Sequence, residues 1–215
     1  MKLLLYFSLT ITLYTNTILF ADIRSDFFSA VHSGDIKSVK KHIDRGINVN
    51  LQDERRRTPL MIATYKNDIK MAKLLVDNGA DVNIQDEKLN SPFLYAAARG
   101  LIGIVKLTYK EADTRNVLNI FGGNALIPAC EKGHLGTVKF LLENTDIDVN
   151  HVNHLSCTAL LEVVILGNDS LIYVEIVKLL LEHGADKTIK DKKGNDALYY
   201  AKERNLKNIE KLLAD

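Results

Sequence analysis

The chain has 215 residues, of which 47% are hydrophobic and 26% are charged. It contains 28 basic and 27 acidic side chains. This composition is typical of a globular domain and excludes disordered, collagen-like and all-membrane chains. The balanced charge also argues against a nucleic-acid-binding protein, because such proteins concentrate an excess of Lys and Arg on one face.

The N-terminus departs from this average. Residues 3–20 contain no charged side chain, follow the basic Lys2 and lead to the small residue Ala21. This order is typical of a secretory signal peptide, so we predict a signal peptide over 1–21 and an exported chain over 22–215, either periplasmic or secreted. The alternative is an uncleaved anchor. A membrane span needs about 20 strongly apolar residues, whereas this run is diluted by Ser, Thr and Asn, so we expect no membrane span after cleavage.

One sequence pattern recurs through the rest of the chain: a Ser, Thr, Asn or Asp is followed nine residues later by Gly or Asn. The starts are Ser25, Thr58, Ser91, Asn124, Thr158 and Asp196, and their partners are Gly34, Asn67, Gly100, Gly133, Gly167 and Asn205. Polar side chains at the start cap a first helical turn, and Pro59 and Pro92 suit the first helical position. Gly or Asn can adopt the left-handed conformation that ends a helix. The pattern therefore predicts six short helices at a period near 33 residues.

A second, amphipathic helix is predicted after each of these, because apolar residues then recur at a spacing of three to four. The segments 58–63 (Thr-Pro-Leu-Met-Ile-Ala) and 76–83 (Val-Asp-Asn-Gly-Ala-Asp-Val-Asn) resemble the ankyrin repeat, which has a period of 33 and a Thr-Pro-Leu-His-x-Ala signature. The resemblance covers residues 25–215. It implies one all-α repeat solenoid of about six stacked units, caps included, joined by β-hairpin-like turns. Together with the leader, it also suggests a bacterial source.

Three departures from the repeat carry their own expectations. The segment 108–116 replaces the apolar helix end and the Gly of repeat three, so we predict a distorted turn there. Pro128 falls in the first half of a helix and disfavours helical geometry at Ile127, so repeat four should begin irregularly. Five inserted residues, 168–172, are placed between the two helices of repeat five, as either a tolerated surface loop or a binding loop.

The sequence contains no phosphate-binding loop, no zinc-peptidase or hydrolase motif and no Cys-x-x-Cys pair. We therefore expect no enzymatic activity and no cofactor. The weak metal candidates are His151, His154 and Cys157, whose spacing fits no standard zinc pattern; a polar turn is the alternative. Cys130 is expected in the core, with a Cys130–Cys157 disulfide as the alternative in an exported protein.

The resemblance implies a protein-binding module, because proteins similar to this family bind partners through a concave face formed by inter-repeat turns and first-helix ends. Carried onto this chain, the candidate partner-binding residues are Arg55, Arg57, Tyr65, Lys66, Lys88, Arg99, Ile120, Phe121, Leu155 and Ile165. Phe121 could instead cover the distorted turn of repeat three, and the run 55–57 could be a solvated turn. We expect an exported monomer that binds one protein partner. The alternatives are a secreted effector that acts on host proteins and a modulator of a neighbouring envelope enzyme.

Overall fold

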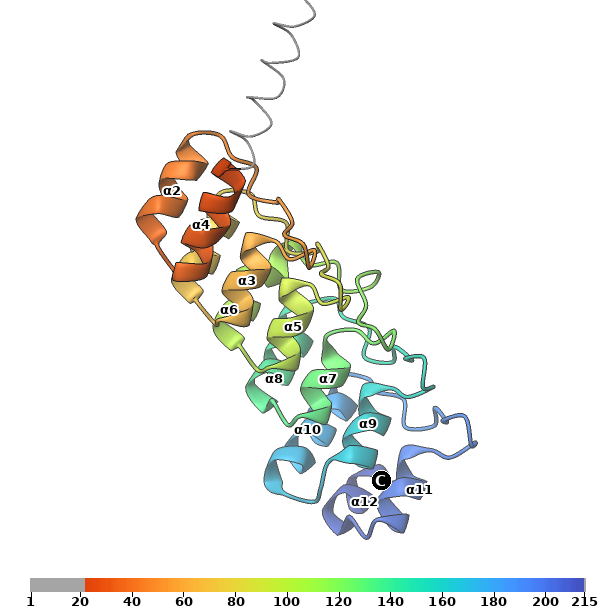
Figure 1. Cartoon of the computed structure of the whole chain (residues 1–215). Helices are drawn as coiled ribbons and strands as arrows, with labels where there is room; N and C mark the ends of the chain where they lie inside the picture. Colours follow the sequence, from red (N-terminus) through yellow and green to blue (C-terminus); the bar gives the residue numbers. More distant parts are fainter. Residues whose placement is uncertain (1–21, 215) are drawn as a thin grey trace, which may run out of the picture.

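The structure is a computed structural model that describes residues 22–214, and the signal peptide predicted for 1–21 lies outside these residues. Six antiparallel helix pairs stack into one elongated array, and the turns between repeats project from the same side (Figure 1). The first helices of the pairs are residues 22–33, α3 (Pro59–Tyr65), α5 (Pro92–Ala98), α7 (Leu126–Glu131), α9 (Ala159–Leu166) and α11 (Ala197–Glu203). The second helices are α2 (Ile36–Asp44), α4 (Ile69–Asp77), α6 (Ile102–Thr108), α8 (Leu135–Asn144), α10 (Leu171–Glu182) and α12 (Lys207–Ala214).

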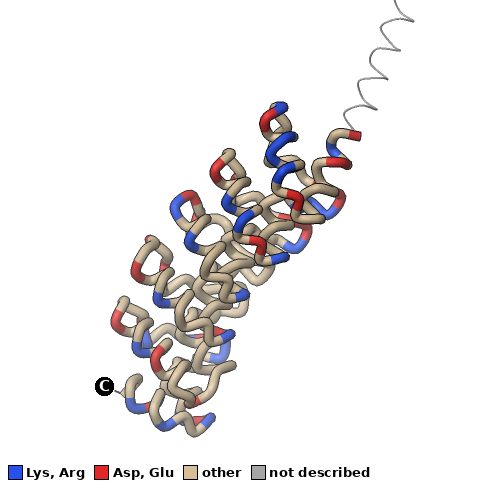
Figure 2. The backbone as a smooth tube through the Cα atoms, turned by 90° about the vertical axis from the view of Figure 1, so that its left-hand side faces the viewer, with Lys and Arg blue, Asp and Glu red and all other residues tan. Residues whose placement is uncertain are grey.

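The architecture confirms the predicted all-α solenoid. No residue in the described range lies in a β-strand, so the connections between repeats are turns without a β-ladder. The array is gently curved, and charged residues of both signs are spread along its length (Figure 2). Within residues 22–214, no helix is both long enough and apolar enough to cross a membrane.

The first-helix caps follow the prediction in most repeats. Thr58, Ser91, Thr158 and Asp196 each accept a hydrogen bond from the backbone N–H three residues further on. The prediction was wrong for Ser25, which lies inside the helix at 22–33 because the residues before it are already helical. Capping is a local interaction, so the sequence predicts it well wherever the helix start is itself determined locally.

Repeat four begins irregularly, as predicted, because α7 starts one residue later after its cap than α3, α5, α9 and α11 do after theirs. The prediction that Pro128 disfavours helical geometry at Ile127 was wrong, since Ile127 is helical, and Pro128 removes no helical hydrogen bond. The side chain of Asn124 accepts from the N–H groups of Leu126 (3.1 Å) and Ile127 (3.4 Å), and α7 starts only at Leu126. Pro128 is therefore the third residue of the helix. The first N–H groups of a helix have no acceptor within it, so a proline ring is tolerated there.

Two helix ends differ from the common pattern. Gly34, Asn67, Gly100, Gly133 and Asn205 have the predicted positive φ, but Gly167 is extended, with φ −74° and ψ −158°. The insertion explains the difference, because the chain runs on from Gly167 and α10 begins at Leu171. Leu171 and Ile172 are thus helical rather than part of a loop, which corrects the prediction for 168–172. In repeat three a 3₁₀ turn, η1 (Tyr109–Glu111), follows α6 and confirms the predicted distortion.

A continuous apolar core runs between the helices of all the repeats. Val138 and Leu141 are fully buried within it, and so is Cys130, as predicted for that residue. The largest buried side chains come from several repeats: Phe27, Leu60, Met61, Met71, Leu75, Ile104, Leu126, Leu160 and Ile176. Each helix pair is too small to bury its own apolar face, so neighbouring repeats stabilise one another.

Asparagine side chains also link one repeat to the next. Asn50, Asn83 and Asn150 each donate from Nδ2 to a backbone carbonyl of the following repeat and accept at Oδ1 from one of its N–H groups. Asn116 occupies the same position in repeat three, but its side chain bonds to Asp113 in its own turn. The junction between repeats three and four therefore lacks this link.

Candidate functional site

Five inter-repeat turns are built on the same side-chain hydrogen bonds. Each begins with an Asp or Asn whose Oδ1 accepts from the N–H groups two and four residues further on, and two backbone hydrogen bonds close the turn. These residues are Asp53, Asp86, Asn119, Asn153 and Asp191. The turns are thus rigid, and they fix the direction of the side chains at their tips.

The other oxygen of the turn residue's side chain, Oδ2 in an Asp, is free to bind a neighbouring side chain. Asp86 accepts from the hydroxyl of Tyr65 at 2.5 Å, and Asp53 pairs with Arg57 at 2.6 Å. The ring of Tyr65 also lies edge-on against Tyr95, with ring centroids 4.4 Å apart. Burial and the bond to Asp86 raise the pKa of the Tyr65 hydroxyl. Tyr65 and Arg57, two predicted partner-binding residues, are therefore held by the turns of their own protein.

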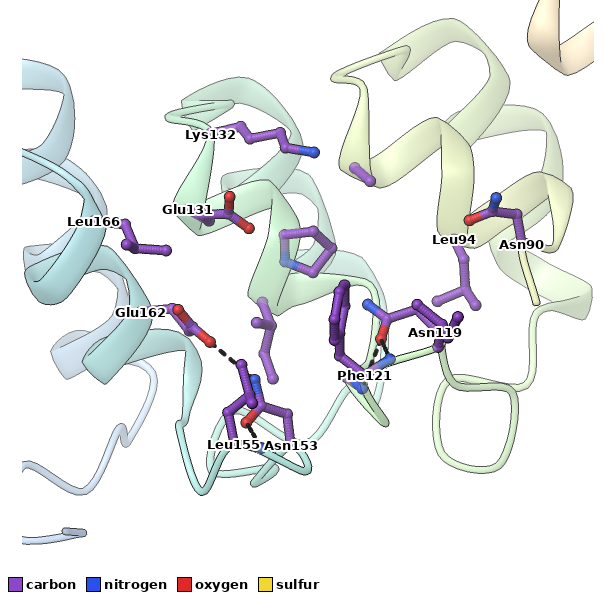
Figure 3. Close-up of a pocket in the computed structure, with 15 residues that line it drawn as sticks. Asn90, Leu94, Asn119, Phe121, Glu131, Lys132, Asn153, Leu155, Glu162 and Leu166 are labelled. Atoms are coloured by element: carbon purple, nitrogen blue, oxygen red, sulfur yellow. Dashed lines mark hydrogen bonds between the residues drawn. The ribbon is translucent and has the colours of Figure 1, made fainter. Parts of the chain in front are cut away.

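A hollow of about 350 Å³ lies between the turns 119–123 and 153–157 and the helices α5, α7 and α9 (Figure 3). Four large apolar side chains on its rim are more than half exposed: Ile120 (60%), Phe121 (58%), Leu155 (53%) and Leu166 (54%). The N–H of His154 donates to the carbonyl of Phe121 at 2.8 Å and joins the two turns. Scattered apolar side chains are ordinary on a protein surface, whereas an exposed cluster of them is typical of contact sites.

Two carboxylates lie among these apolar side chains. Glu162 is the fourth residue of α9 and only 7% exposed, and its Oε1 accepts from Nδ2 of Asn153 at 2.9 Å. Burial raises the pKa of Glu162, and the nearby Glu131 carboxylate adds to this effect, while the bond from Asn153 opposes it. Figure 3 shows Glu131, Glu162 and Leu166 at one end of the hollow. The hollow is thus apolar at its rim and acidic inside.

The predicted partner-binding residues divide into two groups. Ile120, Phe121 and Leu155 meet in the hollow. The others lie elsewhere: Arg55 and Arg57 share a shallow surface with Arg24, the ammonium of Lys66 donates to the carbonyl of His32, Lys88 is exposed on the turn 86–90, and Arg99 is exposed at the end of α5.

Sequence reasoning selected one residue that lies outside the hollow and missed another inside it. Ile165 is half-buried against the core, and its neighbour Leu166 faces the hollow instead. Glu162 was not predicted. The sequence does contain an indication of this residue, because Glu162 is the one charged residue in the apolar segment 159–166.

The weak metal candidates do not form a set of three ligands among the described residues, although two of them contact the same glycine. His151 bonds through Nε2 to the carbonyl of Gly122 at 2.6 Å, and the ring of His154 lies against the same glycine. A Cβ at Gly122, whose φ is 69°, would lie 2.4 Å from the His154 ring, so this position requires glycine. Among the described residues, no three His, Cys, Asp or Glu side chains are placed to hold a metal ion.

The two cysteines are not joined. Cys130 and Cys157 are both buried free thiols, so the alternative of a disulfide between them was wrong. Cys130 is enclosed by apolar side chains of the core, and Cys157 lies in the turn before α9, where its Sγ is 3.7 Å from the carbonyl oxygen of Leu155. Burial raises the pKa of Cys157 to about 11, so this thiol is unreactive at neutral pH.

Stacked helix pairs joined by these turns define an ankyrin-repeat solenoid. The family model for ankyrin repeats in three copies matches residues 27–115 and 93–191, and the chain belongs to this family. The fold generally serves as a protein–protein interaction module and is typically not enzymatic.

Several known proteins are similar to the chain. The ankyrin repeat protein YahD of Escherichia coli (strain K12) is 44% identical over 73 residues, which are 34% of this chain and 36% of YahD, so the match spans about a third of that relative. The crystal structure of the ankyrin repeat protein EF0377 is 43% identical, with a TM-score of 0.84 over 88% of this chain and 96% of that one. An ankyrin repeat domain (ABAYE2397) from Acinetobacter baumannii AYE is 41% identical, with a TM-score of 0.84 over 87% and 95%. The ankyrin repeat domain of Bcl-3, a member of the IkappaB family, is 25% identical, with a TM-score of 0.75 over 88% and 84%.

Proposed function

We propose that the chain is an exported, non-enzymatic module that binds one protein partner through the hollow over repeats three to five. The observation that carries this proposal is the exposure of four large apolar side chains around one hollow. Burial of apolar surface is the dominant favourable contribution to most protein–protein association. Aromatic side chains in such positions often contribute much of the binding energy, which makes Phe121 the strongest single contributor.

The frame of the hollow also favours binding. Asn119 and Asn153 hold their turns with two side-chain hydrogen bonds each, and the Phe121–His154 backbone bond joins the turns. A surface that is already ordered loses little conformational entropy when a partner binds. The leader pattern at 1–21 supports a partner in the periplasm or outside the cell.

The test is capture of a partner by the purified chain from envelope and secreted fractions of the source organism. We expect the wild type to retain a partner that a Phe121→Ala, Leu155→Ala double variant loses. A matched control replaces Ile69 and Leu171, which are 46% and 86% exposed and lie outside the hollow, with Ala. The control should bind like the wild type, and circular dichroism should show all three chains folded. A partner retained equally by the folded double variant would contradict this site.

A further inference from the structure

Glu162 is a charged residue at a helix position where the other repeats have uncharged side chains. Four residues after the repeat start, where Glu162 stands in repeat five, other repeats have Ile62, Tyr95, Pro128 and Tyr200. A carboxylate buried at such a position costs stability unless it is fully hydrogen-bonded or paired with a cation. Within residues 22–214, only its Oε1 is bonded to the protein, to Asn153. No enclosed side-chain oxygen among the described residues lacks a partner, so the Oε2 of Glu162, which makes no such bond, reaches solvent. One carboxylate oxygen is thus left for a ligand.

The turn residue is matched to this carboxylate. Asp53, Asp86 and Asp191 accept hydrogen bonds from Arg57, Tyr65 and Tyr200, which are donors. In the turn that faces Glu162 the residue is Asn153, whose Nδ2 donates to the acid instead. Asn153, which stands where three of the other turns have Asp, holds the Glu162 carboxylate in place. Because it is uncharged, it also avoids a third negative charge in the hollow.

The acidic charge of the hollow is not neutralised by the protein itself. Neither Glu131 nor Glu162 forms an ion pair within the described part of the chain. Lys132 is the basic residue of the lining, and Figure 3 shows it directed away from both carboxylates. Burial lowers the pKa of the His134 imidazole, and the nearby charges of Lys132 and Arg99 lower it further.

We propose that the hollow receives a Lys or Arg side chain of the partner, carried on a segment whose neighbouring side chains are apolar. This inference rests on the proposed function and specifies its ligand. The aliphatic stem of such a side chain fits against Leu155 and Leu166, and its charged head pairs with Glu162 and Glu131. The face of Phe121 offers a further contact to a cation. A metal ion does not fit, because no suitable set of three ligands surrounds any point in residues 22–214.

The probe is a phage-displayed library of random twelve-residue peptides selected on the purified full chain. We expect enriched peptides to contain a Lys or Arg flanked by apolar residues. Synthetic copies should bind Glu162→Gln at least about tenfold more weakly than the wild type, as should copies with the basic residue replaced by Met. Glu54→Gln, an exposed carboxylate in a turn outside the hollow, is the matched control and should bind normally.

Two kinds of failure can be told apart. Enriched peptides that have no basic residue, or that bind Glu162→Gln unchanged, but are lost with Phe121→Ala overturn the inference and leave the binding site in place. Peptides that bind Phe121→Ala as tightly as the wild type would contradict the proposed site as well. A selection that enriches no peptide would do the same. A combined change of Glu162 and the peptide's basic residue should weaken binding by less than the sum of the two single changes if they form a pair.

Discussion

Folding disfavours the ionised form of Glu162, mainly because its carboxyl group is buried. Its pKa is raised on folding, so the native state binds its proton more tightly than the unfolded state does. The stability that this group contributes is fully present below the unfolded pKa, about 4.3, and is lost as the pH rises through the folded pKa. A residue that lowers stability without a structural benefit is more easily explained by function than by folding.

We expect Glu162→Gln to raise the melting temperature by a few degrees at pH 7, with the difference shrinking towards pH 4. The amide oxygen of Gln can still accept from Asn153 Nδ2, so the local geometry is kept. Thermal melts at several pH values measure this. A variant that melts below the wild type at pH 7, or one whose advantage does not change with pH, would show that the ionised carboxylate stabilises the fold.

Residue-level prediction from the sequence succeeded where the interaction is local. The caps at Thr58 and Ser91 depend on atoms three residues away, and they formed as predicted. The site depends on residues from different repeats: Phe121, Leu155 and Leu166 meet only because the repeats stack in register. Turn positions could therefore be named as candidates, but the Asn153–Glu162 pair and the hollow around it could not.

At the scale of elements, the insertion of repeat five acts as a cap for the last helix. Leu206, just before α12, has no side-chain oxygen, and Asp169 accepts from the N–H groups of Asn208 and Ile209 at 3.0 to 3.2 Å. In return, Arg204 donates to the carbonyls of Val164 and Gly167 at the end of α9. The insertion was expected to be a tolerated loop or a binding loop, and the structure shows that it joins repeat five to repeat six.

Asp169→Ala should destabilise the C-terminal repeat by about 1 kcal/mol, the usual effect of losing a helix cap. Hydrogen exchange should become faster in α12 and stay unchanged in α4. Asp44→Ala removes an exposed acidic side chain at the end of α2 and serves as the control, with no expected change in α12. Equal protection of α12 in both variants would mean that the cap adds nothing.

At the scale of the whole molecule, stability comes from the core that runs through all the repeats. Leu141 is fully buried, whereas Phe121 is 58% exposed. We expect Leu141→Ala to lower the free energy of unfolding by about 2–5 kcal/mol, because it leaves a cavity. Phe121→Ala should change it by less than about 1 kcal/mol. Urea denaturation followed by circular dichroism compares them, and a large loss with Phe121→Ala would place that ring in the core and remove it from the binding surface.

The missing asparagine link between repeats three and four has a mechanical consequence. Asn50, Asn83 and Asn150 each bond to the backbone of the following repeat. The junction between repeats three and four is instead held outside the core by Thr114 and the exposed Arg115, which both contact Asp146, and by the bonds of His154 and His151 to the turn 119–123. A stack in which each unit touches only its neighbours separates under tension at its weakest joint. Pulled from its two ends, the array should part first between α6 and α8. The hollow includes residues from both sides of this joint, so a ligand seated there would raise the force needed to open it.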